Sequence, residues 1–290
     1  MKASKAIVAV ALFLAGWLAG TAKADFVLDG TRHLDVTTSH NTGILDDNST
    51  AAVLAGGHIG KAYVNDNALL TVDRPDGSIY SWAVDQGWLY NNGRIQVFSA
   101  YGVKELGARD TSSVHISGGS VSSLYPLGAS TVDISSGSVE NLPAGDASTV
   151  HISGGSVHGL GANDTTTMDI SGGSVSELSA YNASTVDISG GSVNTVYADG
   201  ASAITFYGYD FHATGGGLSL VLYDVIDGVP QYKVLGRGVL TGKWRDGTSW
   251  FTNIFRNDST TPILAIPEPA TISLLALGGL AVLRRRRRMA

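Results

Sequence analysis

Residues 184–193 read Ser-Thr-Val-Asp-Ile-Ser-Gly-Gly-Ser-Val, and the chain repeats this phrase five times between Ser112 and Ala201. Each copy follows the previous one by 18 residues, without an insertion. The apolar positions keep the same step, as the isoleucines show: Ile116, Ile134, Ile152, Ile170 and Ile188. A fixed period held by apolar positions through consecutive copies is typical of a solenoid.

Each copy contains the pattern of two short strands and two corners. In residues 185–189 apolar and polar side chains alternate, which is typical of a half-buried strand. Gly190 and Gly191 then allow the positive φ of a tight corner. The other corner carries Asp146, Asp164, Asn182 or Gly200. Copies stacked about 4.8 Å apart would bury columns of Val, Ile, Leu and Ala, a column being one position of the coil in successive copies. We therefore predict an all-β fold, a parallel β-helix (β-solenoid) of 18-residue coils.

The solenoid is expected to span residues 25–202, because divergent copies precede the regular ones. Their spacing places Leu54 and Phe98 in the column of Ile116. Residues 73–97 break the phase and are interpreted as an insert rich in aromatic side chains, namely Tyr80, Trp82, Trp88 and Tyr90. These rings either pack the insert against the solenoid or stack on sugar rings.

The pattern changes after the last copy, in residues 203–262. Two Asp-Gly pairs each separate alternating runs, which is a hairpin signal. The runs are Leu218–Val225 and Val229–Leu235 around Asp227-Gly228, and Gly238–Trp244 and Thr248–Phe255 around Asp246-Gly247. A stack of parallel coils leaves an open edge. We predict an antiparallel C-terminal cap over that edge, the alternative being an independent small domain.

The first 24 residues have the three parts of a secretory signal peptide. Lys2 and Lys5 form the charged head, residues 6–18 the apolar run, and Ala22-Lys23-Ala24 a cleavage site between small residues. The mature chain is expected to begin at Asp25, the alternative being an N-terminal membrane anchor. The chain has no cysteine, so disulfides do not stabilise it.

The last residues, 263–290, combine three elements in a fixed order. Pro267-Glu268-Pro269 comes first, and an apolar run from Ala270 to Leu283 follows. The third element is a basic cluster, Arg284, Arg285, Arg286, Arg287 and Arg288. Arginines favour the cytoplasmic side of a membrane, and the run is shorter than the roughly 20 residues of a comfortable transmembrane helix. We expect a short hydrophobic helix that anchors the chain transiently.

This tail resembles the PEP-CTERM sorting signal of exported bacterial proteins, and the Ser/Thr/Gly-rich repeats resemble those of surface proteins that carry it. The resemblance covers about 25 residues. It implies an exosortase-type transpeptidase as a transient partner, removal of the tail, and delivery to the cell surface or the extracellular matrix. The same tail is also described as a C-terminal region of ice-binding proteins, a description that says little about ice.

The charge of the chain argues against nucleic acid as a partner. Without the signal lysines and the sorting tail, the body carries a net charge of about −13. Nucleic-acid binding needs clustered Lys and Arg side chains. The sequence contains neither Lys nor Arg between Arg109 and Lys233. The same gap removes the usual base of a β-helix lyase.

Three classes of function remain, and the first is a non-catalytic surface or matrix protein without a cofactor. The second is a module that binds glycans, such as extracellular polysaccharide, or ice. Its candidate surface is the outward threonine column, Thr131, Thr149, Thr167 and Thr185. Stacked threonines also suit any strand surface.

The third class is a β-helix enzyme that acts on polysaccharide. Asp169 and Asp187 would lie about one strand spacing apart, near the separation of a retaining glycosidase pair. They also belong to an outward polar column that stacking alone produces, His115, Asp133, His151, Asp169 and Asp187. We therefore expect no catalytic residues. Asp146 and Asp164 could bind calcium, but the calcium-binding β-roll phrase does not occur, so no metal site is expected.

Overall fold

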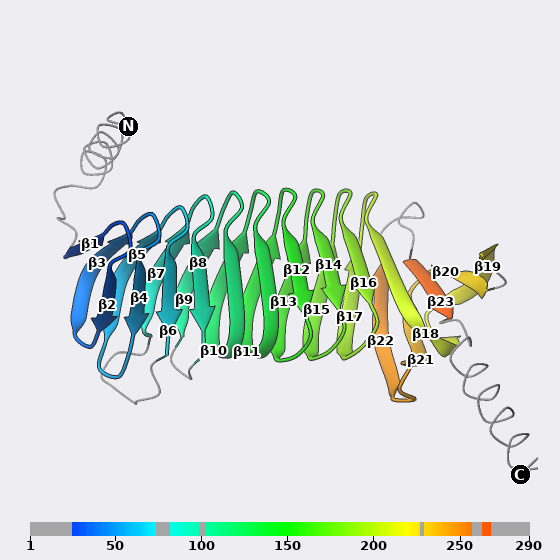
Figure 1. Cartoon of the computed structure of the whole chain (residues 1–290). Coiled ribbons are helices and arrows are strands. Elements are labelled where there is room, and N and C mark those ends of the chain that lie inside the picture. The colour runs from blue at the N-terminus through cyan, green and yellow to red at the C-terminus, as the bar shows by residue number, and fades with distance from the viewer. Residues whose placement is uncertain (1–24, 74–81, 99–101, 227–228, 257–262, 268–290) are drawn as a thin grey trace, which may run out of the picture. The chain divides into compact units, whose positions relative to one another are not determined.

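A computed structural model describes residues 25–73, 82–98, 102–226, 229–256 and 263–267. All regular elements in these ranges are β-strands (Figure 1). The chain divides into two compact units. Unit 1 runs to Leu142 and includes 147–149, and unit 2 runs from Val150 and includes 143–146. The predicted signal peptide, the Asp227-Gly228 turn and the tail beyond Pro267 lie outside the described residues.

Unit 1 is a parallel β-solenoid in which each strand pairs in register with its equivalent in the next coil. One sheet follows β2, β4, β6, β8 and β10, and the other follows β1, β3, β5, β7, β9 and β10. β10 continues the register into β11. The strands are β1 (Phe26–Leu28), β2 (His33–Val36), β3 (Ser39–Leu45), β4 (Thr50–Val53), β5 (His58–Val64), β6 (Leu69–Val72), β7 (Val84–Leu89), β8 (Arg94–Val97), β9 (Val103–Ala108), β10 (Ser113–Pro126) and β11 (Thr131–Ala144).

Unit 2 continues the solenoid pattern and adds the cap. One sheet follows β13, β15 and β17, and the other follows β14, β16 and β18, all parallel. The coil strands are β12 (Thr149–Ile152), β13 (Ser156–Ala162), β14 (Thr167–Ile170), β15 (Ser174–Ala180), β16 (Thr185–Ile188) and β17 (Ser192–Ala198). The cap strands are β18 (Ala203–Thr214), β19 (Ser219–Ile226), β20 (Val229–Leu235), β21 (Gly238–Lys243), β22 (Ser249–Arg256) and β23 (Ile263–Pro267).

The inward columns are those that the repeat predicts. Ile170 pairs with Ile188, which pairs with Phe206, and all three are buried. The β-solenoid fold with 18-residue spacing and antiparallel strands near the C-terminal end is therefore confirmed. A further inward column was missed because its residues are polar. Ser184 and Ser202 are fully buried, and their hydroxyls donate to corner carbonyls, from Ser184 to Tyr181 at 2.8 Å and from Ser202 to Asp199 at 3.0 Å.

Both corners need left-handed backbone. Asp146, Asp164 and Asn182 have φ between 54° and 58°, and short Asp and Asn side chains tolerate this region. Gly191 has φ 74°, and a Cβ there would lie 2.6 Å from the carbonyl carbon of Gly172 in the preceding coil. The Gly corner is therefore fixed both by conformation and by the close stacking of backbones.

The expected alignment of the first copies is wrong by one residue. Val53 pairs with Val72 and Val97 pairs with Ile116, so these coils are 19 residues long. Val53 and Val97, rather than Leu54 and Phe98, occupy the inward column, and Phe98 is 44% exposed.

The expected insert at residues 73–97 is too long. β7 and β8 keep the register of the coils on either side, so the regular pattern resumes by Val84. Trp88 lies on β7, and a Cβ at Gly107 would meet its ring at 2.5 Å. This ring belongs to a coil strand rather than to an insert, so it does not decide between packing and sugar stacking for the insert, and Tyr80 lies outside the described residues.

The cap is mixed rather than purely antiparallel. The predicted hairpins form as β19–β20 and β21–β22. However, β22 pairs with β17 in parallel, and β23 pairs with the first half of β18 in parallel and with β20 antiparallel. The cap therefore extends to Pro267, beyond the boundary expected at residue 262.

Aromatic rings close the core of unit 2 at the cap. The ring of Phe206 stacks on Trp250 with centroids 5.2 Å apart, and Trp250 stacks on Trp244 at 4.6 Å. The indole Nε1 of Trp244 donates to the Gly191 carbonyl at 2.7 Å. At the first coils of unit 1, Phe26 lies over Gly43 and meets His40 edge-on at 5.2 Å.

Deleting one whole coil tests the register. Removal of residues 168–185 joins Thr167 to Val186 and keeps every column, because Met168 and Val186 are register partners. The variant should melt cooperatively within about 5 °C of the full chain, since each coil contacts only its neighbours. Removal of residues 168–176 instead moves polar side chains inward and should abolish folding. Circular dichroism melting measures both, and equal melting would contradict the register.

Candidate functional site: the outward columns and the C-terminal cap

The threonine column faces outward, as predicted. In unit 2, Thr167 and Thr185 are register partners, and Thr167 is exposed. In unit 1, Thr131 and Thr149 are half-buried positions at the starts of their strands. Asp169 and Asp187 follow two residues later and are also register partners. The hydroxyl row in unit 2 therefore has a row of carboxylates beside it on the same face.

Asp187, on this face, has a raised pKa. Burial raises its pKa above the usual value of 3.8, and the nearby charge of Asp169 raises it further. Hydrogen bonds with the side chains of Thr205 and Tyr207 oppose this rise. Burial, and then Asp187, also raise the pKa of the Tyr207 phenol. Sequence reasoning found the carboxylate pair but missed Tyr207, which lies on β18 of the cap.

The corner residue Asp164 binds a backbone amide and a side-chain amide of the neighbouring corners, at Asp146 and Asn182. The Asp164 carboxylate accepts from the Asp146 N–H and from Nδ2 of Asn182, both at 3.2 Å. The Asp164 carboxylate thus ties successive corners together. In the ranges that the structure describes, no three His, Cys, Asp or Glu side chains are grouped to hold a metal ion.

Unit 1 carries two histidine-centred polar chains that the sequence analysis did not identify. His33 lies between Thr50 and Asp35, with Nδ1 2.6 Å from Oγ1 of Thr50 and Nε2 2.9 Å from Oδ1 of Asp35. The buried His58 has Nδ1 3.3 Å from Ser39 Oγ and Nε2 3.3 Å from an Asp85 carboxylate oxygen. Both chains link side chains of successive coils.

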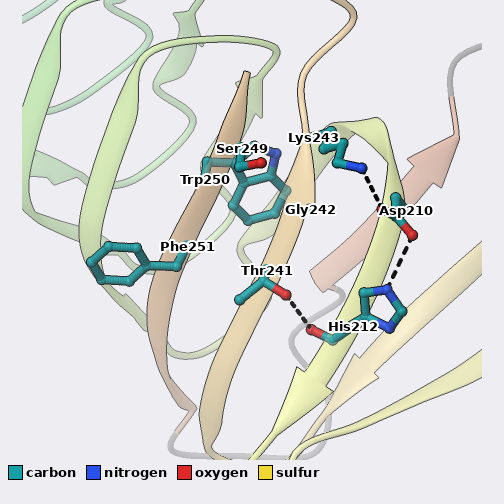
Figure 2. Close-up of a pocket in the computed structure, with 8 residues that line it drawn as sticks. All are labelled: Asp210, His212, Thr241, Gly242, Lys243, Ser249, Trp250 and Phe251. Atoms are coloured by element: carbon teal, nitrogen blue, oxygen red, sulfur yellow. Dashed lines mark hydrogen bonds and ion pairs between the residues drawn. The ribbon is translucent and has the colours of Figure 1, made fainter. Parts of the chain in front are cut away.

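The cap of unit 2 contains a pocket of about 320 Å³. It lies over three neighbouring strands, β18, β21 and β22 (Figure 2). Its lining residues are Asp210, His212, Thr241, Gly242, Lys243, Ser249, Trp250 and Phe251. The volume is near the lower limit of small-ligand pockets, about 300 Å³. The pocket therefore suits a small ligand or one unit of a larger one.

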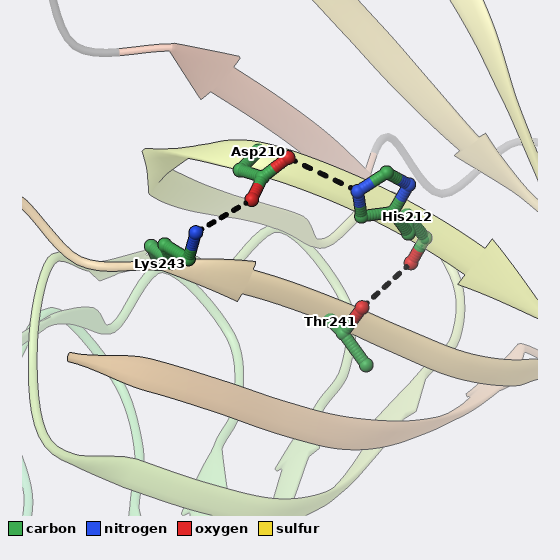
Figure 3. Close-up of polar contacts among 4 residues, drawn as sticks. All are labelled: Asp210, His212, Thr241 and Lys243. Carbon is green, nitrogen blue, oxygen red and sulfur yellow. Dashed lines mark hydrogen bonds and ion pairs between the residues drawn. The ribbon is translucent and has the colours of Figure 1, made fainter. Parts of the chain in front are cut away.

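Asp210 is the centre of the polar contacts in this pocket (Figure 3). Its two carboxylate oxygens lie 2.9 Å from Nζ of Lys243 and 3.1 Å from Nε2 of His212. Hydrogen bonding to Lys243, and then to His212, lowers the pKa of Asp210, and the same carboxylate raises the pKa of Lys243. The acid and the amine are both charged at neutral pH and balance each other.

An irregularity in β18 places these side chains. The register against β21 shifts between Tyr209 and His212, and Asp210 has φ 58°. A bulge of this kind changes the direction of side chains along a strand. Phe211, between the two polar residues, instead packs against Trp250 with centroids 6.0 Å apart.

Gly242 and Trp250 form the inner side of the pocket. They are register partners, and a Cβ at Gly242 would lie 2.7 Å from the Trp250 ring. Glycine therefore lets the indole lie flat against β21. Phe251, the next residue on β22, points to the other side of the strand and is 58% exposed. Its register partner is Thr241, whose hydroxyl donates to the His212 carbonyl at 3.5 Å.

The fold and the end of the chain together define an all-β solenoid protein with a sorting segment next to its cap. Residues 265–288 match the PEP-CTERM protein-sorting motif, so the resemblance of the tail is confirmed. The motif implies that the chain is exported and is a substrate of exosortase, and it indicates membrane-associated sorting. No curated protein and no solved structure matches the chain significantly.

The matched motif begins inside the folded cap. Ala265 is fully buried in β23, whereas Glu268, Pro269, the run from Ala270 to Leu283 and the arginine cluster lie outside the described residues. Across the residues that are described, no helix is long and apolar enough to cross a membrane.

Replacing Asp187 with Asn tests the carboxyl of the outward column. The raised pKa means that the fold favours the protonated acid, so this contribution is full below pH 3.8 and is lost as pH rises through the folded pKa. Asp187→Asn should therefore raise the melting temperature at pH 7 and flatten its decline above pH 3.8.

Asp246→Asn is a control of opposite sign. The Thr248 N–H donates to the Asp246 carboxylate at 2.8 Å and lowers its pKa, so that contribution is present above pH 3.8 and is lost as pH falls through the folded pKa. Asp246→Asn should not stabilise the fold at pH 7. Calorimetry from pH 3 to 8 measures both, and a destabilised Asp187→Asn protein at pH 7 would contradict the assignment.

Proposed function

We propose that the protein is a non-catalytic component of the cell surface or of the surrounding polymer, attached through the cap of its solenoid. One observation carries this proposal. β23, the strand that leads into the sorting motif, is built into the cap and pairs with both β18 and β20. The segment that the sorting machinery handles therefore emerges from folded structure.

The contacts of β23 support a processed C-terminus that lies close to the cap. Ile263 and Ala265 are fully buried, and residues 263–267 run parallel to Ile204–Gly208 of β18. The same part of β18 pairs with β16, a coil strand. Removal of the tail after Pro267-Glu268-Pro269 would leave β23 in place. The new C-terminus would then be tied to the last coils of unit 2.

The surface composition supports a role outside the cell that requires solubility at high concentration. The body is strongly acidic, which opposes self-association through charge repulsion. Backbone pairing and buried apolar columns provide the stability without disulfides, because the chain has no cysteine. These properties suit a presented structural element, and extracellular polysaccharide is the polymer we propose beside it.

Charge variants of the tail test the sorting role. Replacing all five residues from Arg284 to Arg288 with Ser removes the charges that oppose translocation, so unprocessed chain should appear in the periplasm or medium. In the matched control the same five arginines are replaced with Lys. This variant keeps the positive charges and should hold the segment at the membrane as the native tail does. Replacing Pro267-Glu268-Pro269 with three alanines should leave full-length chain in the inner membrane.

Mass spectrometry of each cell fraction gives the outcome. Native surface material should contain no peptide beyond about residue 270. An intact arginine cluster on the mature surface protein would contradict processing and would leave a permanent C-terminal anchor.

A substitution in β23 tests the attachment through the cap. Ile263→Asp lies outside the matched motif and buries an unpaired charge, which costs about 3 kcal/mol or more. The cap should lose protease resistance and the near-ultraviolet signal of the stacked Trp244 and Trp250, while the far-ultraviolet β signal persists. Leu264→Thr changes a half-buried neighbour and is the matched control. If the Ile263→Asp protein behaved like the native protein, the assignment of β23 to the cap would be contradicted.

A further inference from the structure

The pocket on the cap has a chemical character that the sorting motif does not explain. A flat apolar ring and a set of charge-balanced polar groups lie on one face of β18, β21 and β22. Phe251 and Thr241 are register partners on this face, as are Ser249 and Lys243 (Figure 2). β18 supplies Asp210 and His212 beside them.

The polar groups can still form hydrogen bonds with a ligand. Each carboxylate oxygen of Asp210 can accept more than one hydrogen bond, and Lys243 has three donors, of which Asp210 uses one. The His212 side chain is 67% exposed, and its second ring nitrogen is a further donor or acceptor. Thr241 and Ser249 add two hydroxyls. The pocket thus offers donors and acceptors together.

The charge of the pocket selects among ligands. Lys243 and Asp210 neutralise each other at 2.9 Å, so neither a strong anion nor a strong cation finds an unopposed charge. An anionic ligand would also meet the carboxylate of Asp210. The groups therefore suit a neutral ligand that donates and accepts hydrogen bonds, as a sugar hydroxyl does.

The exposed ring accounts for the other half of the recognition. Phe251 lines the same pocket and is 58% exposed, and an aromatic face offers a flat apolar contact surface. A pyranose ring has a matching apolar face of C–H groups and a rim of hydroxyls. The pocket volume of about 320 Å³ limits the bound unit to a small one. We propose that this pocket binds a neutral sugar unit of a glycan, with Phe251 under the ring and Asp210, His212 and Lys243 at its hydroxyls.

This site is independent of the route of export, so the two proposals fail separately. The full-length protein would be applied to an array of neutral hexose, N-acetylhexosamine and uronic acid oligosaccharides, and the affinities for any bound glycan measured by calorimetry. Phe251→Ala and His212→Ala should each weaken binding of a neutral glycan by about tenfold or more.

Tyr223→Ala is the matched control. Tyr223 is an equally exposed aromatic residue, at 61%, but it lies on β19 outside the pocket and beside Lys233. Its loss should leave glycan affinity unchanged, and all three variants should melt like the native protein. Binding restricted to uronic acids, binding that survives both pocket substitutions, or no binding to any glycan would each overturn the proposal.

Discussion

In-register parallel pairing between successive coils is the constraint on which the rest of the structure depends. Each strand pairs with the strand at the same position of the next coil, so inward apolar positions stack on inward apolar positions and outward polar positions on outward polar positions. This arrangement favours Ile on Ile and Val on Val inside. Outside, it puts Asp187 over Asp169, and burial together with the charge of Asp169 raises the pKa of Asp187. It also brings the corner backbones so close that Gly191 has no room for a side chain over Gly172.

A stack of coils must also end, and the aromatic residues serve this purpose within each unit. In unit 2, Phe206 takes the place of the isoleucine in its column, and Trp250 and Trp244 stack beyond it. In unit 1, Phe26 lies over Gly43 at the first coils. Large flat rings suit these positions because they cover several columns at once. The first role of the cap is therefore to cover the end of the apolar core, and any binding surface on it is secondary.

The sequence predicted whatever depends on local pattern. The isoleucine spacing predicted the inward columns, and Asp-Gly pairs predicted the hairpins β19–β20 and β21–β22. It failed where adjacent apolar residues compete, because nothing local decides between Val53 and Leu54 or between Val97 and Phe98 once a coil gains one residue. It also missed the buried serine column, in which Ser184 and Ser202 donate to carbonyls that only the folded corner brings near.

The candidate site could not be predicted because its parts come together only through the pairing of distant strands. Asp210 and His212 share a face through an irregularity in β18, while Lys243 and Phe251 arrive from the next hairpin. β18 in turn pairs with β16, β21 and β23, and so joins the coils, the pocket and the strand before the sorting motif. A glycan held at the pocket and a C-terminus released by processing would therefore lie on the same cap. Attachment of the chain and binding of the glycan would then both take place at the cap. The coils would remain exposed on the cell surface.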